Sequence, residues 1–587
     1  MKRLILLYIL MISTTAMQGE VYYKVSCVKP ETHYVMVEMK VDNPKGNFVD
    51  FIMPVWTPGS YKVREFARNV EQFSASGDNQ SLISKKVNKN TWRVSFKKGV
   101  SHVTVSYQVY AFEYGVRTSY VDQFQAFLHG VSVFMYADGY QSQKCKVAFE
   151  KPNTWQKITV ALPMNGESEY EAENYDLLAD SPFAIGNHDI IEFTASGIKH
   201  RVAMLGEGNY DSEKIKTDFT KIIEKEYSIF NDHPSPEYVI FIQNVEAGGG
   251  GLEHLNSQTS VITRWAYTND AKYKAFLALM AHEYFHLWNV KRLRPIELGP
   301  FDYTKEVYTN MLWIAEGFTA YYDDLFLKRC EIYKDDEYLG IIATTLNKIE
   351  NLPGNKVQSL AMSSFDAWIK LYIPDENSDN SSVSYYSKGM LAALVIDLEI
   401  IKRTNGKKKL DDVLRYLYTE YYKNKKRGFT EEEFAAALEM VAGSSFNDLL
   451  NNVVYTTNPI DYAKYFNYVG IELKNTPSIK TPLGITTKYE NGKTMVKYVE
   501  INRSASKSGI SVNDEILAIN GYRVNGDLEE FTSAFKVGKE VDILVSRMGK
   551  LIPLKLIPEK DPGVNYKVVK MEAPNEEQKT LSNFWLK

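Results

Sequence analysis

The stretch Ala281-His282-Glu283-Tyr284-Phe285-His286 carries the strongest signal for the fold of this chain. It lies in an apolar segment, 271–293, whose pattern predicts a helix. At about 100° per residue, His282 and His286 differ by about 40° and lie one turn apart, so both imidazoles can reach one metal ion. Glu283 lies about a third of a turn away and can reach a water molecule at the ion's open position, which suits a general base. The alternative is an ordinary pair of helix histidines beside a surface glutamate.

A catalytic zinc site needs three protein ligands and one open position, so a third ligand must come from outside this helix. The next predicted helix, 307–329, contains Glu316 among apolar residues, where an unpaired charge would be costly. Glu316 is therefore the predicted third ligand of one Zn²⁺ ion. Asp323 follows seven residues later on nearly the same side and can accept the second ring proton of a ligand histidine. The alternative for Asp323 is a partly exposed helix acid.

Composition places the chain among large globular proteins. Its 587 residues suggest three or four domains. Lys and Arg total 69 against 73 for Asp and Glu, a net charge of −4, which excludes the basic footprint of a nucleic-acid-binding protein. Three widely separated cysteines rule out dependence on a disulfide framework.

Hydrophobic periodicity predicts a multidomain α+β protein. Alternating apolar residues, as in 35–41 and 103–109, predict an all-β N-terminal domain over 17–199. A mainly helical domain is expected over 200–465 and a small domain with strands over 466–560. The tail 561–587 ends in an apolar patch at 584–586 that predicts a docked terminal helix.

Five helices are expected in the middle of the chain, at 271–293, 307–329, 385–403, 410–422 and 431–441. Asp270 is the candidate cap of the first helix, and Thr430 with Glu433 predicts a capping box before the last.

The first sixteen residues have the pattern of a secretory signal peptide. Lys2 and Arg3 precede an apolar run over 4–12, and small residues follow up to Ala16. The run is shorter than the roughly 20 residues that span a bilayer, so cleavage is expected rather than a membrane anchor, the alternative. The mature protein is therefore expected to be exported, to the periplasm or to the medium.

Several motifs together resemble a known family. The run from His282 through Leu287-Trp288-Asn289-Val290-Lys291-Arg292-Leu293-Arg294-Pro295, followed by Trp313 to Gly317 with Tyr321 and Tyr322, resembles the M61 or glycyl aminopeptidase family of zinc peptidases. The loop Pro54–Tyr61 resembles that family's N-terminal β domain. This resemblance implies a gluzincin catalytic domain, which is thermolysin-like, in an exported bacterial protein. It also implies an aminopeptidase that prefers small first residues such as Gly or Ala.

The same resemblance implies roles for two further segments. Gly250-Gly251-Leu252-Glu253-His254 is similar to the loop whose glutamate receives the substrate's α-amine in the related aminopeptidase N group, with Gly250 and Gly251 allowing close backbone approach. Tyr386-Ser387-Lys388-Gly389 is similar to the motif whose tyrosine donates to the oxyanion, although the adjacent Tyr385 is the alternative. Glu316 follows His286 by 30 residues, further than in that group. The loop ends Leu-Glu-His where that group has Met-Glu-Asn, so the sequence does not determine which residues form the first substrate pocket.

The C-terminal region resembles a bacterial-type PDZ domain, on Pro482-Leu483-Gly484-Ile485, Ser504-Ala505-Ser506-Lys507-Ser508-Gly509-Ile510 and Asp514-Glu515-Ile516-Leu517-Ala518-Ile519-Asn520-Gly521. In such a domain Leu483, Gly484 and Ile485 would hold the C-terminal carboxylate of a bound peptide. The alternative is a packing module that binds nothing.

These observations predict an exported zinc aminopeptidase acting on peptides. The alternatives are a zinc endopeptidase with the same metal, and a non-catalytic secreted scaffold that binds protein C-termini through the PDZ domain. No nucleic-acid partner and no stable membrane span are expected. The natural substrate, the PDZ ligand, the oligomeric state and the final compartment stay open.

Overall fold

The computed structural model describes residues 20–166, 168–476 and 483–587, and contacts divide the chain into two units. The first unit ends at Asp189, and the second contains Ile190–Lys587 together with Pro58–Val63. The boundary precedes the predicted position 199 because the strands that follow it pair within a sheet of the second unit. The predicted signal peptide, 1–16, lies outside the described residues.

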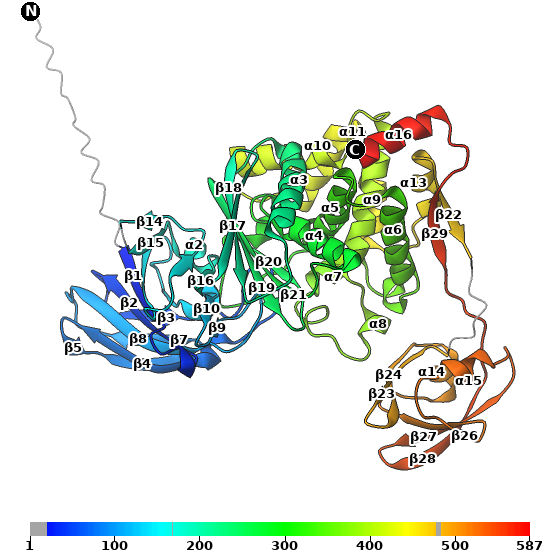
Figure 1. Cartoon of the computed structure of the whole chain (residues 1–587), viewed down its shortest axis with the longest axis horizontal. Coiled ribbons are helices and arrows are strands. Elements are labelled where there is room, and N and C mark those ends of the chain that lie inside the picture. The colour runs from blue at the N-terminus through cyan, green and yellow to red at the C-terminus, as the bar shows by residue number, and fades with distance from the viewer. Residues whose placement is uncertain (1–19, 167, 477–482) are drawn as a thin grey trace, which may run out of the picture. The chain divides into compact units, whose positions relative to one another are not determined.

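The described residues of the first unit form three sheets (Figure 1). The largest has the order β14 (Met164–Asn165), β15 (Glu169–Ala172), β12 (Lys144–Glu150), β1 (Glu20–Ser26), β2 (Tyr34–Asp42), β8 (His102–Tyr110), β4 (Val70–Gly77), β5 (Gln80–Ser81). The second has the order β13 (Lys157–Thr159), β16 (Phe183–Gly186), β10 (Gln125–Leu128), β9 (Tyr120–Val121), and the third β11 (Tyr136–Ala137), β3 (Phe48–Ile52), β7 (Thr91–Ser95), β6 (Ile83–Asn88). Two short helices, α1 (Gly130–Val133) and α2 (Tyr175–Ala179), accompany them. The predicted alternation is confirmed, since the apolar residues at every second position of β2 and β8 are buried.

A five-stranded sheet, which the mainly helical prediction missed, opens the second unit. Its order is β17 (Asp189–Ala195), β18 (Ile198–Leu205), β19 (Glu237–Val245), β21 (Ser257–Thr263), β20 (Gly251–Glu253). Strands β18, β19 and β21 are parallel, whereas β20 is an antiparallel edge strand. The central strand β19 is buried from Tyr238 to Asn244 and is apolar over most of that length, so it lacks the alternation that marks a half-buried strand. Strand β21 is buried although most of its residues are polar, so it has no apolar pattern to recognise.

Helices make up most of the rest of the second unit. They are α3 (Ser212–Phe230), α4 (Asp270–Phe285), α5 (Phe318–Arg329), α6 (Asp335–Glu350), α7 (Leu360–Phe365), α8 (Ser378–Ser381), α9 (Tyr385–Arg403), α10 (Leu410–Leu417), α11 (Glu431–Ala442), α12 (Asn447–Leu450) and α13 (Tyr462–Tyr468), with π-helical turns η4 (Trp313–Gly317), η6 (Tyr418–Asn424) and η7 (Asn451–Tyr455). Helix α5 packs on both α4 and α9 (Figure 1). Among the described residues, no helix has the length and apolar character required to cross a membrane.

Some predicted helix ends are confirmed and others are wrong. Helix α9 has the predicted bounds, and the capping box of Thr430 with Glu433 is present. Helix α4 is capped by Asn269 rather than Asp270, and it ends at Phe285 rather than at 293. The second predicted helix begins at Trp313 rather than at 307, and the α-helix expected over 410–422 becomes π-helical after Leu417.

In the turns after α4, side chains bind backbone carbonyl groups of other segments. Asn289 Nδ2 donates to the carbonyl oxygens of Ile314 and Ala315 at 3.0 Å each. Arg292 Nη1 donates to the carbonyl oxygen of Leu255 at 2.7 Å. These bonds tie the turns after α4 to the segments that contain Leu255 and Glu316.

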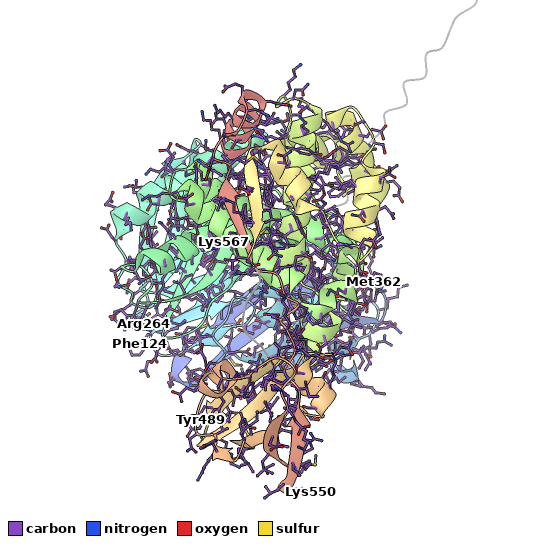
Figure 2. The ribbon with its side chains drawn as sticks, turned by 90° about the vertical axis from the view of Figure 1, so that its right-hand side faces the viewer. Phe124, Arg264, Met362, Tyr489, Lys550 and Lys567 are labelled. Atoms are coloured by element: carbon purple, nitrogen blue, oxygen red, sulfur yellow. The ribbon has the colours of Figure 1, made fainter. Side chains whose placement is uncertain are left out.

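The small strand-rich module is an insertion between two paired strands. β22 (Ile471–Asn475) pairs antiparallel with β29 (Tyr566–Lys570), which carries the labelled Lys567 (Figure 2). Between them lie β23 (Ile485–Glu490), β24 (Lys493–Val499), α14 (Ser504–Ser508), β25 (Glu515–Ile519), β26 (Tyr522–Arg523), α15 (Glu529–Ser533), β27 (Val541–Arg547) and β28 (Lys550–Leu556), which enclose their own apolar core. The chain then continues past β29 into α16 (Glu576–Leu586), whose Trp585 is buried and donates from Nε1 to Tyr321 Oη at 2.7 Å.

Candidate metal centre

Two histidines at the end of α4 direct their Nε2 atoms to one point. His286 is the C-cap of the helix and still has helical angles, φ −60° and ψ −16°, so the one-turn spacing to His282 is kept. Asp323 Oδ2 lies 2.9 Å from His282 Nδ1, and the carbonyl oxygen of Asn289 lies 2.6 Å from His286 Nδ1. Because these acceptors hold a proton on each Nδ1, both Nε2 atoms keep a lone pair for a metal.

Glu316 comes from the π-helical turn η4 and completes this set. Its Oε2 lies 3.4 Å from His282 Nε2 and 3.3 Å from His286 Nε2. Burial would raise the pKa of Glu316, but the positive charge of the two imidazoles, which a proton on Nε2 supplies when no metal is bound there, lowers it to about 2, so the carboxylate is charged. Two imidazole nitrogens and one carboxylate oxygen, all within 4.8 Å of one another, match in type and number the three protein ligands that a catalytic zinc ion requires.

The position of Glu316 depends on contacts made by its neighbours. Asn289, whose carbonyl oxygen holds His286, also donates from its amide to the carbonyl oxygen of Ala315 at 3.0 Å. On the other side, η4 crosses α9 so closely that a Cβ on Gly317 would lie 2.5 Å from Gly389 Cα. Sequence reasoning missed both features, although two glycines at corresponding positions of predicted helices are a usable signal for close helix packing.

Glu283 is buried beside the three candidate ligands. Burial raises the pKa of its carboxyl to about 7, with the Glu253 and Glu316 carboxylates adding and the two imidazoles opposing. Within the described parts of the chain, Oε2 of Glu283 has no hydrogen-bond partner. A Cβ on Gly251 would lie 2.0 Å from Glu283 Oε1. Gly251 therefore provides the space that this carboxylate occupies.

Glu253 lies on the edge strand β20 and is buried, with 4% of its surface exposed. One of its oxygens lies within 4.8 Å of donor atoms of Glu283 and His286. Gly59, in the Pro58–Val63 segment, approaches so closely that its Cβ would lie 2.4 Å from Glu253 Oε1. Gly250, with φ +110°, has open space around it. Sequence reasoning expected the loop up to Tyr61 to be part of the β domain and did not anticipate this approach.

The adjacent tyrosines of α9 have different surroundings. Tyr385 is fully buried, whereas Tyr386 is partly exposed and its ring stacks on His282 at 6.3 Å between centroids. Tyr386 Oη lies 3.3 Å from Tyr372 Oη. Burial, with the Glu316 charge nearby, raises the pKa of Tyr386 well above its ordinary value, so the hydroxyl keeps its proton. Of the two candidates, Tyr386 is the one beside a histidine of the donor set.

The predicted PDZ residues lie apart from this centre in the sequence, in the inserted module. Leu483 is buried in the module's core, Gly484 has φ +75°, and Ile485 begins the edge strand β23. Pro482, the first residue of the quoted motif, lies outside the described residues. The peptide-binding role of this segment stays a prediction.

Comparison with known proteins finds two matching domain models and several similar solved structures. Residues 22–187 match the model of the peptidase M61 N-terminal domain, and residues 275–392 match that of M61 glycyl aminopeptidase. The structure resembles an aminopeptidase N family protein from Idiomarina loihiensis, with 30% identity, coverage of 97% of this chain and 100% of that one, and a TM-score of 0.90. No curated protein matches the sequence.

More remote structural likenesses are also found. A variant of the M1 zinc metallopeptidase from Deinococcus radiodurans has 11% identity, coverage of 75% and 94%, and a TM-score of 0.49. Yeast LTA4 hydrolase with bestatin has 13% identity, coverage of 75% and 68%, and a TM-score of 0.46. The Idiomarina relative, similar over nearly the whole chain, shows that this protein belongs to the aminopeptidase N family; its residues 22–187 and 275–392 match the N-terminal and catalytic domains of M61 peptidases, and it is a hydrolase that acts on peptide bonds.

Proposed function

We propose that this peptidase is a zinc aminopeptidase that removes small first residues, Gly or Ala, from peptides. The observation that carries the proposal is the convergence of His282, His286 and Glu316 beside two further buried carboxyls, Glu283 and Glu253. The preference for small residues rests on the resemblance to M61 glycyl aminopeptidases, whose model matches residues 275–392.

The metal would be held by both Nε2 atoms and by the Glu316 carboxylate. Zinc bound there lowers the pKa of a coordinated water toward about 7 and polarises the scissile carbonyl. Glu283, adjacent and with a raised pKa, is suited to accept the proton of the attacking water and to pass it to the leaving nitrogen. The steric fit against Gly251 keeps its carboxylate in this position.

Two other residues would fix the substrate. A free α-ammonium group pairs with the buried Glu253 carboxylate, so the first peptide bond reaches the metal and removal of single residues follows from geometry. Tyr386 keeps its proton and can donate it to the oxyanion of the tetrahedral intermediate.

The experiment compares Gly- and Ala-arylamides with their N-acetylated forms, before and after treatment with a chelator. Activity on the free amines alone, lost on chelation and restored by Zn²⁺, supports the proposal. Activity indifferent to chelation contradicts the zinc assignment. If the N-acetylated substrates are cleaved as fast as the free amines, and the Glu253→Ala variant cleaves them at the same rate, the enzyme is instead an endopeptidase.

A second role, for the inserted module, is favoured by its edge strand. β23 has a neighbour on one side only among the described strands, so an extended peptide can pair with the other side, with its carboxylate at Leu483, Gly484 and Ile485. Binding of free-carboxylate peptides, but not of their amides, to the full-length protein supports this role. Full affinity for the amides contradicts it. If the purified protein contains less than one zinc ion per chain but still binds such peptides, the scaffold alternative is favoured.

We also propose that the protein is exported after removal of residues 1–16. The supporting pattern is the charged, apolar and small-residue order of that segment. N-terminal sequencing of the protein from the medium or periplasm should begin just after Ala16. Recovery of the protein only inside the cell, with its first residues intact, contradicts export.

A further inference from the structure

The rings of Tyr385 and His282 lie against that of Tyr386, whose hydroxyl proton can turn about the C–O bond. The Tyr385 ring lies 4.8 Å from it at 24°, and the His282 ring lies 6.3 Å away at 23°. Its oxygen is 3.3 Å from Tyr372 Oη. A tyrosine hydroxyl has one proton, so Tyr386 either donates to Tyr372 or accepts from it and keeps its own proton for the substrate.

Tyr372 is itself held by packing. It lies in the turns after α7, where its backbone N–H donates to the carbonyl oxygen of Ala367 at 3.1 Å. Its ring meets the Tyr61 ring edge-on, at 6.0 Å and 75°. Tyr61, only 2% exposed, in turn packs edge-on against Trp368 at 5.7 Å. The position of the Tyr372 hydroxyl is therefore set by surrounding aromatic rings.

We propose that Tyr372 is a positioning residue for peptide hydrolysis, which donates its hydroxyl proton to Tyr386 so that Tyr386 directs its own proton to the oxyanion. The inference rests on the oxyanion role proposed above for Tyr386. Negative charge on the oxyanion draws the Tyr386 proton, and donation from Tyr372 strengthens that bond because linked hydrogen bonds polarise one another.

The pair should act mainly in the transition state. In the free enzyme the two hydroxyls can exchange donor and acceptor roles, and the 3.3 Å separation leaves room to shorten. As charge develops on the substrate oxygen, the arrangement with Tyr372 as donor is favoured, because it leaves the Tyr386 proton available and strengthens its bond to the oxyanion. The contribution of Tyr372 is then greater in the transition state than in the bound ground state, so it should appear in kcat.

The test is a double-mutant cycle on arylamide hydrolysis by the zinc-loaded full-length enzyme. Tyr372→Phe keeps the ring and should lower kcat by about 3- to 10-fold, the usual contribution of one hydrogen bond, with KM unchanged. Tyr386→Phe should lower kcat by about 100-fold or more. Adding Tyr372→Phe to Tyr386→Phe should cost nothing further, because the acceptor is already absent. Tyr308→Phe, which changes an exposed ring that packs on Phe365, is the matched control and should retain full activity.

The outcomes distinguish failure of the Tyr372 proposal from failure of the Tyr386 assignment. A wild-type kcat in Tyr372→Phe, a rise in KM alone, or the same loss in both backgrounds overturns the positioning role and leaves the Tyr386 assignment intact. An unchanged kcat in Tyr386→Phe instead removes the oxyanion role on which the inference rests. Zinc content and far-UV circular dichroism of each variant exclude loss of metal or fold as the cause.

Discussion

Replacing Gly251 by alanine should disable the general base without unfolding the protein. The added Cβ would lie 2.0 Å from Glu283 Oε1, where ordinary contact begins at 3.4 Å, so the carboxylate must move by the difference, about 1.4 Å. The backbone of Gly251 tolerates alanine, since its φ lies outside the left-handed region. The flexible end of the Glu283 side chain moves more easily than the strand, so we expect the substitution to lower the rate of catalysis rather than the stability of the fold.

A displacement of about 1 Å at a catalytic group lowers a rate by about 100-fold. Removal of a general base costs about 100- to 10,000-fold. Gly251→Ala should therefore lower kcat by about 100-fold, approaching the Glu283→Gln variant, with the melting temperature within a few degrees of wild type. Zinc content should be unchanged, because the three candidate ligands are not displaced.

The assay is hydrolysis of an Ala-arylamide, with thermal unfolding and metal analysis of the same preparations. Gly249→Ala is the matched control: it lies two residues earlier, has no atom within 4 Å of the added Cβ and no left-handed φ, and should keep full activity. A kcat for Gly251→Ala within twofold of wild type, or an equal loss in the control, would refute the reasoning.

Three further changes test the surroundings of the centre. Asp323→Asn, which weakens the acceptor at 2.9 Å from His282 Nδ1, should reduce zinc affinity about 10- to 100-fold in a chelator competition, and unchanged affinity contradicts its orienting role. Gly317→Ala forces the backbones of η4 and α9 apart and should lower both the melting temperature and the zinc content, while Gly340→Ala, in open space on α6, should lower neither. Trp585→Ala empties a fully buried site and should cost about 3–5 kcal/mol in urea unfolding, and a cost below about 1 kcal/mol would mean that α16 is dispensable.

The pair of histidines and the adjacent glutamate were predictable because their relation is local. Four residues of helix place His282 and His286 one turn apart in any protein, and the helical angles at His286 preserve this although α4 ends earlier than expected. Capping is equally local, which is why the box of Thr430 and Glu433 was correctly predicted. Even so, the predicted cap of α4 was wrong by one residue, because two adjacent residues there can each cap a helix.

The remaining features depend on residues far apart in the chain. Where Glu316 lies relative to the imidazoles is set by the amide of Asn289 and by the crossing of Gly317 on Gly389. That the ring of Tyr386, and not that of Tyr385, lies beside His282 depends on how α9 packs against the other helices.

Local sequence patterns therefore suffice to predict the type of chemistry: a pair of metal-binding imidazoles, an adjacent general base, and an acid in an apolar segment that needs a charged partner. The approach of Gly59 to Glu253 and the packing of Tyr61 on Tyr372 could not be inferred in that way. These contacts join positions separated by roughly two to three hundred residues. Residues so far apart in the chain come together only when the whole core is buried. Every helix and strand contributes to that core, so no local sequence pattern encodes it.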